Sequence, residues 1–174
     1  MLLRPSKISN VAKWAAASTL LISPLEGGDV RQDRGGRLVT PSAILESSLY
    51  VTDLTAAETF YRDILGLDLL GKVDGRHLFF RCGAGVLLIF NAEATKIPPP
   101  PDARLKVPPH GTVGEGHLCF AASADELARW KARLEAKNIA IESEFEWPQG
   151  GRSIYIRDPS GNSIEFAEPR IWGL

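Results

Sequence analysis

The stretch GRSIYIRDPSGNSIEF, residues 151–166, has a counterpart earlier in the chain, GRHLFFRCGAGVLLIF, residues 75–90. In both stretches apolar residues alternate with other residues on either side of a glycine-containing turn, which predicts a β-hairpin. The two align without gaps, and five identical residues meet: Gly75, Arg76, Arg81, Gly85 and Phe90 match Gly151, Arg152, Arg157, Gly161 and Phe166. The fold is therefore expected to contain one module twice.

The segments before each hairpin extend the repeat. In the first half, a strand-like run precedes Asp53, which can cap a helix that ends at Gly66. In the second half, Ser123 and Glu126 have the spacing of a capping box, and Asn138 can end the helix. The expected strands cover residues 43–51, 67–73, 76–82 and 85–91, then 116–122, 139–145, 152–158 and 162–168.

The pattern predicts an α+β fold of two βαβββ modules, which form a paired, half-barrel-like sheet around a cleft. One face of each sheet is expected to pack on its helix and the other to stay open. Residues 39–174 form this domain, with modules at about 42–94 and 115–170. The segment 95–114 is rich in proline, so we expect an extended linker or a lid over the cleft, with His110 solvated.

Residues 1–38 differ from the rest and are expected to be a disordered extension. An export signal is the alternative, although Lys13 interrupts its apolar part. The net charge of -1 and the pI near 6.3 give no electrostatic reason to bind nucleic acid or a membrane. Cys82 and Cys119 fit reduced thiols, so a cytoplasmic protein is expected.

Three polar residues stand on the expected open faces. Glu165 alternates with apolar neighbours, and in the ungapped alignment it lies opposite Ile89, so the strand itself does not require an acid. The first strands of the modules place Glu46 opposite His117. Two carboxylates and an imidazole that converge in a cleft repel one another or bind a cation. Glu46, His117 and Glu165 are therefore candidate ligands of a divalent metal with open positions for a substrate.

Each candidate ligand also has a simpler explanation. His117 can be a hydrogen-bonded strand histidine, Glu165 can pair with Arg76 or Arg152, and Glu46 can be exposed at a rim. The three together favour a metal. The donor types do not decide among Mn, Fe, Zn, Ni and Mg.

His77 is a further candidate, as a general base, a substrate contact or an additional ligand. By alternation it faces the cleft with Phe79, and in the repeat this pair matches Ser153 and Tyr155. A hydrogen-bonded residue of the cleft wall is the alternative for His77. The residues expected to contact a substrate are Ser48, Tyr50, Phe79, Cys119, Ser153 and Tyr155.

The motifs DLTAAETFYRDILGLDLL, GH and DPSGNSIEF resemble the vicinal oxygen chelate superfamily, which includes glyoxalases, bleomycin-resistance proteins and extradiol dioxygenases. The resemblance covers about residues 42–170. It implies metal ligands at Glu46, His117 and Glu165, with Ile89 at a fourth position that cannot bind metal. It also places Ser153 and Tyr155 where related thiol transferases carry oxyanion-binding hydroxyls.

The resemblance implies a glyoxalase-like metalloprotein, a lyase, isomerase or transferase acting on a small substrate chelated through vicinal oxygens. Ile89 counts against the four-ligand pattern of glyoxalase I itself. A non-enzymatic small-molecule binding protein and a dioxygenase-type enzyme are the alternatives. Relatives of this size commonly form homodimers, in which the site lies within one chain or is shared between two.

Overall fold

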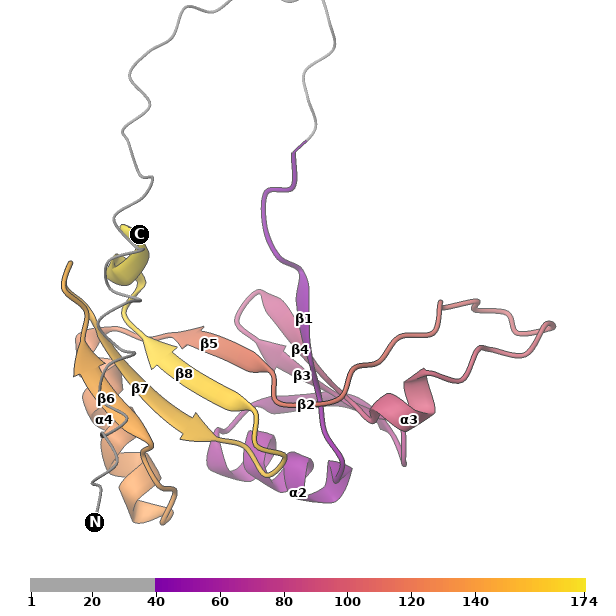
Figure 1. The fold of residues 1–174 in the computed structure, drawn as a ribbon, viewed down its shortest axis with the longest axis horizontal. Helices are drawn as coiled ribbons and strands as arrows, with labels where there is room; N and C mark the ends of the chain where they lie inside the picture. Colours follow the sequence, from indigo (N-terminus) through magenta and orange to yellow (C-terminus); the bar gives the residue numbers. More distant parts are fainter. Residues whose placement is uncertain (1–39) are drawn as a thin grey trace, which may run out of the picture. The chain divides into compact units, whose positions relative to one another are not determined.

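The computed structural model describes residues 40–174, so the expected N-terminal extension over residues 1–38 lies outside the described part. Residues 41–174 form one compact unit with two separate four-stranded sheets (Figure 1). The first sheet has the order β1-β4-β3-β2 and the second the order β5-β8-β7-β6. Each sheet contains one parallel and two antiparallel strand pairings, in the same order. This shared topology confirms the predicted duplicated α+β fold.

The elements follow the two predicted modules closely. The first module contains β1 (Glu46–Tyr50), α2 (Leu54–Glu58), η1 (Thr59–Ile64), β2 (Asp68–Val73), β3 (His77–Cys82) and β4 (Gly85–Phe90). The short helix α3 (Ala92–Thr95) follows it. The second module contains β5 (His117–Ala121), α4 (Ala124–Ala136), β6 (Ser143–Glu146), β7 (Arg152–Arg157) and β8 (Ser163–Ala167), and η2 (Pro169–Trp172) lies near the end of the chain.

The helix boundaries agree with the local sequence signals. The Asp53 side chain accepts hydrogen bonds from two backbone amides of α2, and Ser123 and Glu126 form the capping box of α4. Gly66 and Asn138 both have positive φ, at 81° and 56°, as expected for residues that end helices. Two strands begin later than expected, because β1 starts at Glu46 and β6 starts at Ser143.

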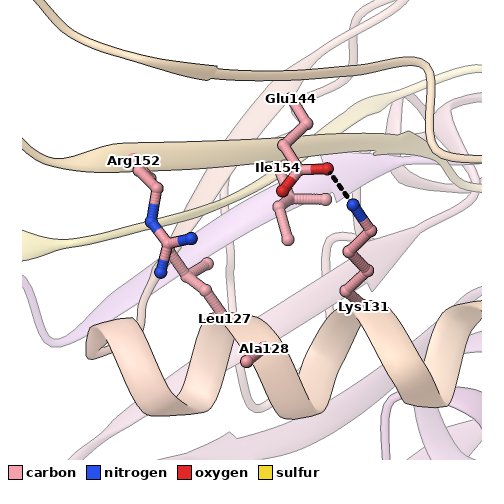
Figure 2. Close-up of a pocket in the computed structure, with 6 residues that line it drawn as sticks. All are labelled: Leu127, Ala128, Lys131, Glu144, Arg152 and Ile154. Carbon is pink, nitrogen blue, oxygen red and sulfur yellow. Dashed lines mark hydrogen bonds and ion pairs between the residues drawn. The ribbon is translucent and has the colours of Figure 1, made fainter.

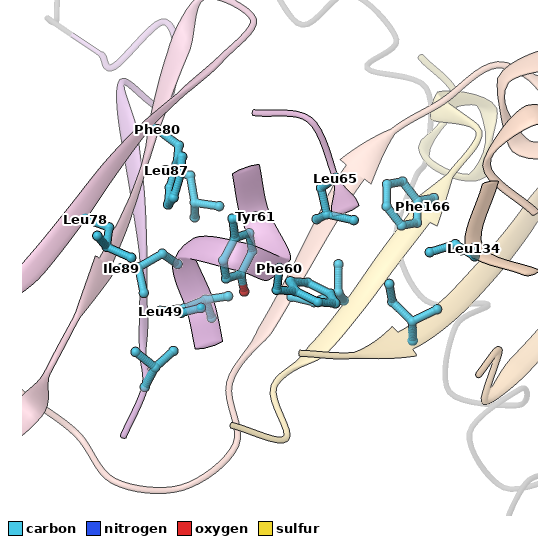
Figure 3. Packing of buried hydrophobic residues seen from close by; sticks show 14 of the residues in the cluster. Leu49, Phe60, Tyr61, Leu65, Leu78, Phe80, Leu87, Ile89, Leu134 and Phe166 are labelled. Carbon is cyan, nitrogen blue, oxygen red and sulfur yellow. The ribbon is translucent and has the colours of Figure 1, made fainter. Parts of the chain in front are cut away.

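The core lies on the helix side of both sheets and forms one continuous cluster (Figure 3). Alternating residues of the strands point into it, including Leu78 and Phe80 from β3 and Ile154 and Ile156 from β7. Trp130 of α4 stacks on the β8 residue Phe166, with ring centroids 4.4 Å apart. The remaining residues of each strand, which include the predicted polar and aromatic site residues, lie on the opposite faces of the sheets.

The strand register corrects one residue of the ungapped alignment. Leu88 pairs with Phe79 in the first sheet, as Glu165 pairs with Tyr155 in the second. The connection of the second hairpin is one residue longer, so the equivalence shifts by one within the last strand. Leu88 therefore occupies the place of Glu165, and the expectation for Ile89 was wrong, because Ile89 is fully buried in the core. The position that the resemblance gives to a fourth ligand is therefore still apolar.

The turn between β7 and β8 is built around Asp158. One carboxylate oxygen, Oδ1, accepts from the backbone amides of Ser160 and Asn162, both at 2.9 Å. The other, Oδ2, accepts from the Asn162 side-chain amide and from the Tyr61 hydroxyl of the first module, both at 2.8 Å. Burial, followed by the charge and hydrogen bond of Asp158, raises the Tyr61 pKa, so this hydroxyl remains a donor.

Asn162 extends the same turn to other strands. Its side-chain amide donates to the backbone carbonyl of Tyr50 on β1 at 3.0 Å, and its Oδ1 accepts from the Gly116 amide at 2.7 Å. The DPSGN turn therefore connects the ends of β1, β5 and β8 through partly buried hydrogen bonds, and the buried bond from Tyr61 to Asp158 also links the two modules.

We predict that Asp158→Asn lowers the free energy of unfolding by about 2 to 3 kcal/mol. The amide is nearly isosteric but replaces one buried charged acceptor, which leaves the Tyr61 hydroxyl and the Asn162 amide without adequate acceptors. Chemical denaturation measures the change. Asp74→Asn, at a side chain that is 92% exposed, is the matched control and should change stability by less than about 0.5 kcal/mol. Equal effects of the two substitutions would contradict the prediction.

Candidate functional site

Glu165 is the central residue of the open face of the second sheet. It lies in the middle of β8, with Cys119 beside it on β5 and Tyr155 beside it on β7. Only 5% of its surface is exposed, which is unusual for a carboxylate. A buried carboxylate requires partners, and the neighbouring side chains supply them.

His117 is the partner of one Glu165 oxygen. Its Nε2 lies 3.2 Å from Oε2 of Glu165, and its Nδ1 lies 3.3 Å from the hydroxyl of Ser163. With metal–ligand bonds of about 2.1 Å, two ligand atoms on one divalent ion are separated by about 3.0 to 3.4 Å. The pair therefore fits two positions of a metal site, and the contact with Ser163 can hold Nδ1 protonated so that Nε2 is the ligand.

Ser153 and Trp147 hold the other oxygen of Glu165. The Ser153 hydroxyl donates to Oε1 at 2.6 Å, and the Trp147 indole donates to the Ser153 hydroxyl at 2.8 Å. Ser153 is fully buried, and its hydroxyl contacts these two side chains, while its role as a substrate contact stays a prediction. Trp147 was missed in the sequence. The alternation of Ser143 and Phe145 continued by two residues would have placed it on this face.

Cys119 and Tyr155 beside Glu165 are protonated at neutral pH. Burial, and then the charge of Glu165, raises the Cys119 pKa to about 12. Burial and a hydrogen bond with Glu165 raise the Tyr155 pKa as well. The phenol ring of Tyr155 lies against His117, with ring centroids 6.3 Å apart. Both residues can offer a proton to a substrate oxygen, but Cys119 is a poor nucleophile.

Glu46, the third expected ligand, lies on β1 in the first sheet and is exposed. Across residues 40–174 the structure brings together no group of three or more histidine, cysteine, aspartate or glutamate residues able to hold a metal. One chain thus pairs His117 with Glu165 and leaves Glu46 apart. The alternative partners for Glu165 are engaged elsewhere, since Arg76 donates to the Ala94 carbonyl and Arg152 lies near Glu168.

The open face of the first sheet is aromatic. His77 stacks on Phe79 at 4.1 Å, and both rings lie edge-on to Phe90 at about 6 Å. Tyr50 adjoins Phe90, and its hydroxyl lies 2.8 Å from Nδ1 of His110. His110 belongs to the proline-rich segment and was expected to be solvated. The segment therefore folds back onto this face at one point.

His77 can accept a proton at neutral pH because its imidazole is neutral. Burial and the neighbouring Arg76 lower its pKa, so the imidazole is neutral at pH 7. Ser48 pairs with Leu88 in the same sheet, and it lies two residues after Glu46 on the same face of β1. The expected substrate contacts Ser48, Tyr50 and Phe79 thus share one face with His77.

Two hollows lie away from the Glu165 face. A cavity of about 230 Å³ between α4 and the second sheet is bordered by the ion pair of Lys131 with Glu144, at 2.5 Å, and by Arg152 (Figure 2). Arg152 and Ile154 alternate with Ser153, so this cavity is on the helix side, opposite Glu165. A second hollow, of about 460 Å³, lies under the proline-rich segment and is mostly apolar.

The chain belongs to the glyoxalase/bleomycin resistance protein/dioxygenase superfamily, whose family model matches residues 43–166. The match spans both modules and the turn at Asp158. No curated protein sequence matches the chain. Within residues 40–174, no helix has the length and apolar character needed to cross a membrane.

Solved structures support the same assignment. A lactoylglutathione lyase from Agrobacterium tumefaciens is 47% identical, with a TM-score of 0.72, and the match covers 77% of this chain and 98% of that chain. A glyoxalase/bleomycin resistance protein/dioxygenase from Nocardioides is 24% identical, with a TM-score of 0.58, over 75% of this chain and 85% of that chain. The second likeness concerns the fold alone.

We predict that Cys119 resists alkylation in metal-free protein. A raised pKa leaves little thiolate at pH 8.5, so iodoacetamide should modify Cys119 roughly a hundredfold more slowly than an ordinary cysteine thiol. Glu165→Gln removes the neighbouring negative charge, which lowers the pKa and accelerates the reaction. Peptide mass spectrometry over time measures both rates.

Cys82 in the same samples is the internal control, because only burial raises its pKa and no contact with Glu165 is involved. Its alkylation rate should be the same in both proteins. If Cys119 reacts at the same rate with and without the Glu165 charge, the electrostatic account of this face is wrong.

Proposed function

We propose that the protein is a metal-dependent, glyoxalase-like enzyme acting on a small substrate that chelates the metal through vicinal oxygens. The observation that carries the proposal is the His117–Glu165 pair, 3.2 Å apart on an open sheet face. A strand carboxylate this deeply buried is explained if it holds a cation together with an imidazole. The family match supports the same class of function.

His117 and Glu165 would supply one nitrogen and one oxygen ligand, and Glu46 would supply a third. The donor set suits Mn, Fe, Zn, Ni or Mg. A divalent ion held by these residues would supply Lewis acidity toward a substrate oxygen. Tyr155 and Cys119, both protonated, flank Glu165 and can donate hydrogen bonds to the same substrate.

His77 is the proposed general base, because its lowered pKa keeps it able to accept a proton at pH 7. Phe79 and Phe90 next to it can hold the apolar part of a substrate and keep water away. The proline-rich segment is the proposed lid, and its contact through His110 with Tyr50 supports this role. Proton movement at carbon, as in a lyase or isomerase, suits these groups; a transferase is the third option.

The similarity to a protein named lactoylglutathione lyase favours the lyase reading. Leu88, at the position equivalent to Glu165, limits the proposed site to three protein ligands in place of the four of the glyoxalase I pattern. The substrate is therefore proposed only as a small vicinal oxygen chelator.

The third ligand leads to a proposal about assembly. In one chain Glu46 stands apart from His117 and Glu165, and the described residues hold no three-ligand cluster. A homodimer in which the first sheet of one protomer faces the second sheet of its partner would complete the site. We include this shared site, in a cytoplasmic homodimer, in the proposed function.

We predict stoichiometric divalent metal in the purified wild-type protein and its loss in Glu165→Ala and Glu46→Ala, measured by elemental mass spectrometry. For a shared site, refolding the two variants together restores about a quarter of the wild-type content. Half of randomly paired dimers are mixed, and each mixed dimer has one intact site. Glu93→Ala, at an exposed side chain of α3, is the control and should keep full metal content.

The outcomes separate the parts of the proposal. Absence of metal from wild-type protein, even after each divalent ion is added, would overturn the enzyme proposal. Metal in the wild type without recovery in the mixture would overturn the shared site and leave the metal function standing.

A non-enzymatic binding protein is the second candidate. The stacked His77 and Phe79, with Phe90 and Tyr50 beside them, favour it, since such a face can hold a planar ligand without a metal. Ligand binding that is unaffected by chelators and by Glu165→Ala would support this candidate over the enzyme.

A further inference from the structure

We propose that Trp147 is a positioning residue for the metal-binding carboxylate, acting through Ser153 on Glu165; the inference rests on the proposed function. The three side chains form one hydrogen-bonded series, from the Trp147 indole to the Ser153 hydroxyl at 2.8 Å, and from that hydroxyl to Glu165 Oε1 at 2.6 Å. Trp147 itself contributes no ligand atom, because its indole N–H is only a donor.

The donor and acceptor chemistry gives this series a single direction. An indole N–H can only donate, so the Ser153 oxygen must accept from Trp147. A serine hydroxyl has one proton, which is then directed to Glu165. An ionised carboxylate only accepts, and it fits the end of the series. Reversal of either bond would leave a donor facing a donor or an acceptor facing an acceptor.

The two carboxylate oxygens of Glu165 therefore have different partners. Oε1 receives the Ser153 proton, and Oε2 faces His117 Nε2 at 3.2 Å. Oε2 is therefore the oxygen that would be available to hold a divalent ion, while Oε1 is engaged by Ser153. A carboxylate free to rotate would lose this orientation, and affinity for the ion would fall with it.

The surroundings of the series are rigid enough for this role. Ser153 is fully buried, and the Trp147 ring packs on Phe145, with centroids 5.0 Å apart. Backbone hydrogen bonds from Trp147 N to the Gly151 carbonyl and from Gly150 N to the Trp147 carbonyl, both at 2.8 Å, close the turn that carries the indole. At Gly151, with φ of +92°, an added Cβ would lie 2.6 Å from Ile171, so this turn admits only glycine.

Calorimetric titration of metal-stripped protein with Mn²⁺, Ni²⁺ and Zn²⁺ tests the proposal. Trp147→Phe keeps a ring but removes the donor, and it should weaken binding by about tenfold to a hundredfold. Ser153→Ala should weaken it at least as much. In the Ser153→Ala background, Trp147→Phe should have no further effect, because Trp147 acts only through that hydroxyl. Trp172→Phe, at an exposed tryptophan, is the matched control and should bind like wild type.

Unchanged affinity in Trp147→Phe, or an equal further loss in the Ser153→Ala background, would overturn the proposal. A second measurement does not need metal. The indole N–H resonance of Trp147 in metal-free protein should be protected from solvent exchange, and Ser153→Ala should abolish the protection. An unprotected wild-type resonance would show that the series is absent. If wild-type protein binds none of the ions while the resonance is protected, the proposed metal function is wrong. The hydrogen-bonded series is then present, but the positioning role of Trp147 is overturned with the metal function.

Discussion

The carboxylate of Asp158 is the group on which the arrangement of the two modules depends. It accepts four hydrogen bonds at the turn before β8, one of them from Tyr61 in the other module. Three of these bonds are buried, so the loss of a donor from any of the three leaves an uncompensated polar group. The same turn sets where β8 begins, and therefore which residues of that strand face the open side. The position of Glu165 follows from it.

The second sheet uses this placement to keep a carboxylate almost out of water. A lone buried charge would be strongly unfavourable, so the stability of this face requires the hydroxyl of Ser153 and the imidazole of His117. Burial, followed by contributions from Glu165, raises the pKa of the Cys119 thiol and of the Tyr155 phenol. Both groups therefore keep their protons at neutral pH.

The two open faces have the same backbone pattern and different chemistry. In the first sheet the place of Glu165 is taken by Leu88, and the rows around it carry Tyr50, Phe79 and His77. In the second sheet the corresponding rows carry hydroxyls, a thiol and a carboxylate. The difference has a physical basis, because the helix-side residues are constrained by a shared core and the open-face residues are not.

The sequence by itself determined the duplicated βαβββ modules, the helix caps at Asp53 and Ser123, and the open-face position of Glu165, because alternation and capping are local properties. Tertiary structure decided the rest. The longer second hairpin moved the equivalent of Glu165 from Ile89 to Leu88, and no single-strand pattern records a register. The engagement of Ser153 by Trp147 and Glu165, and the distance of Glu46 from His117, depend on how strands far apart in sequence pack.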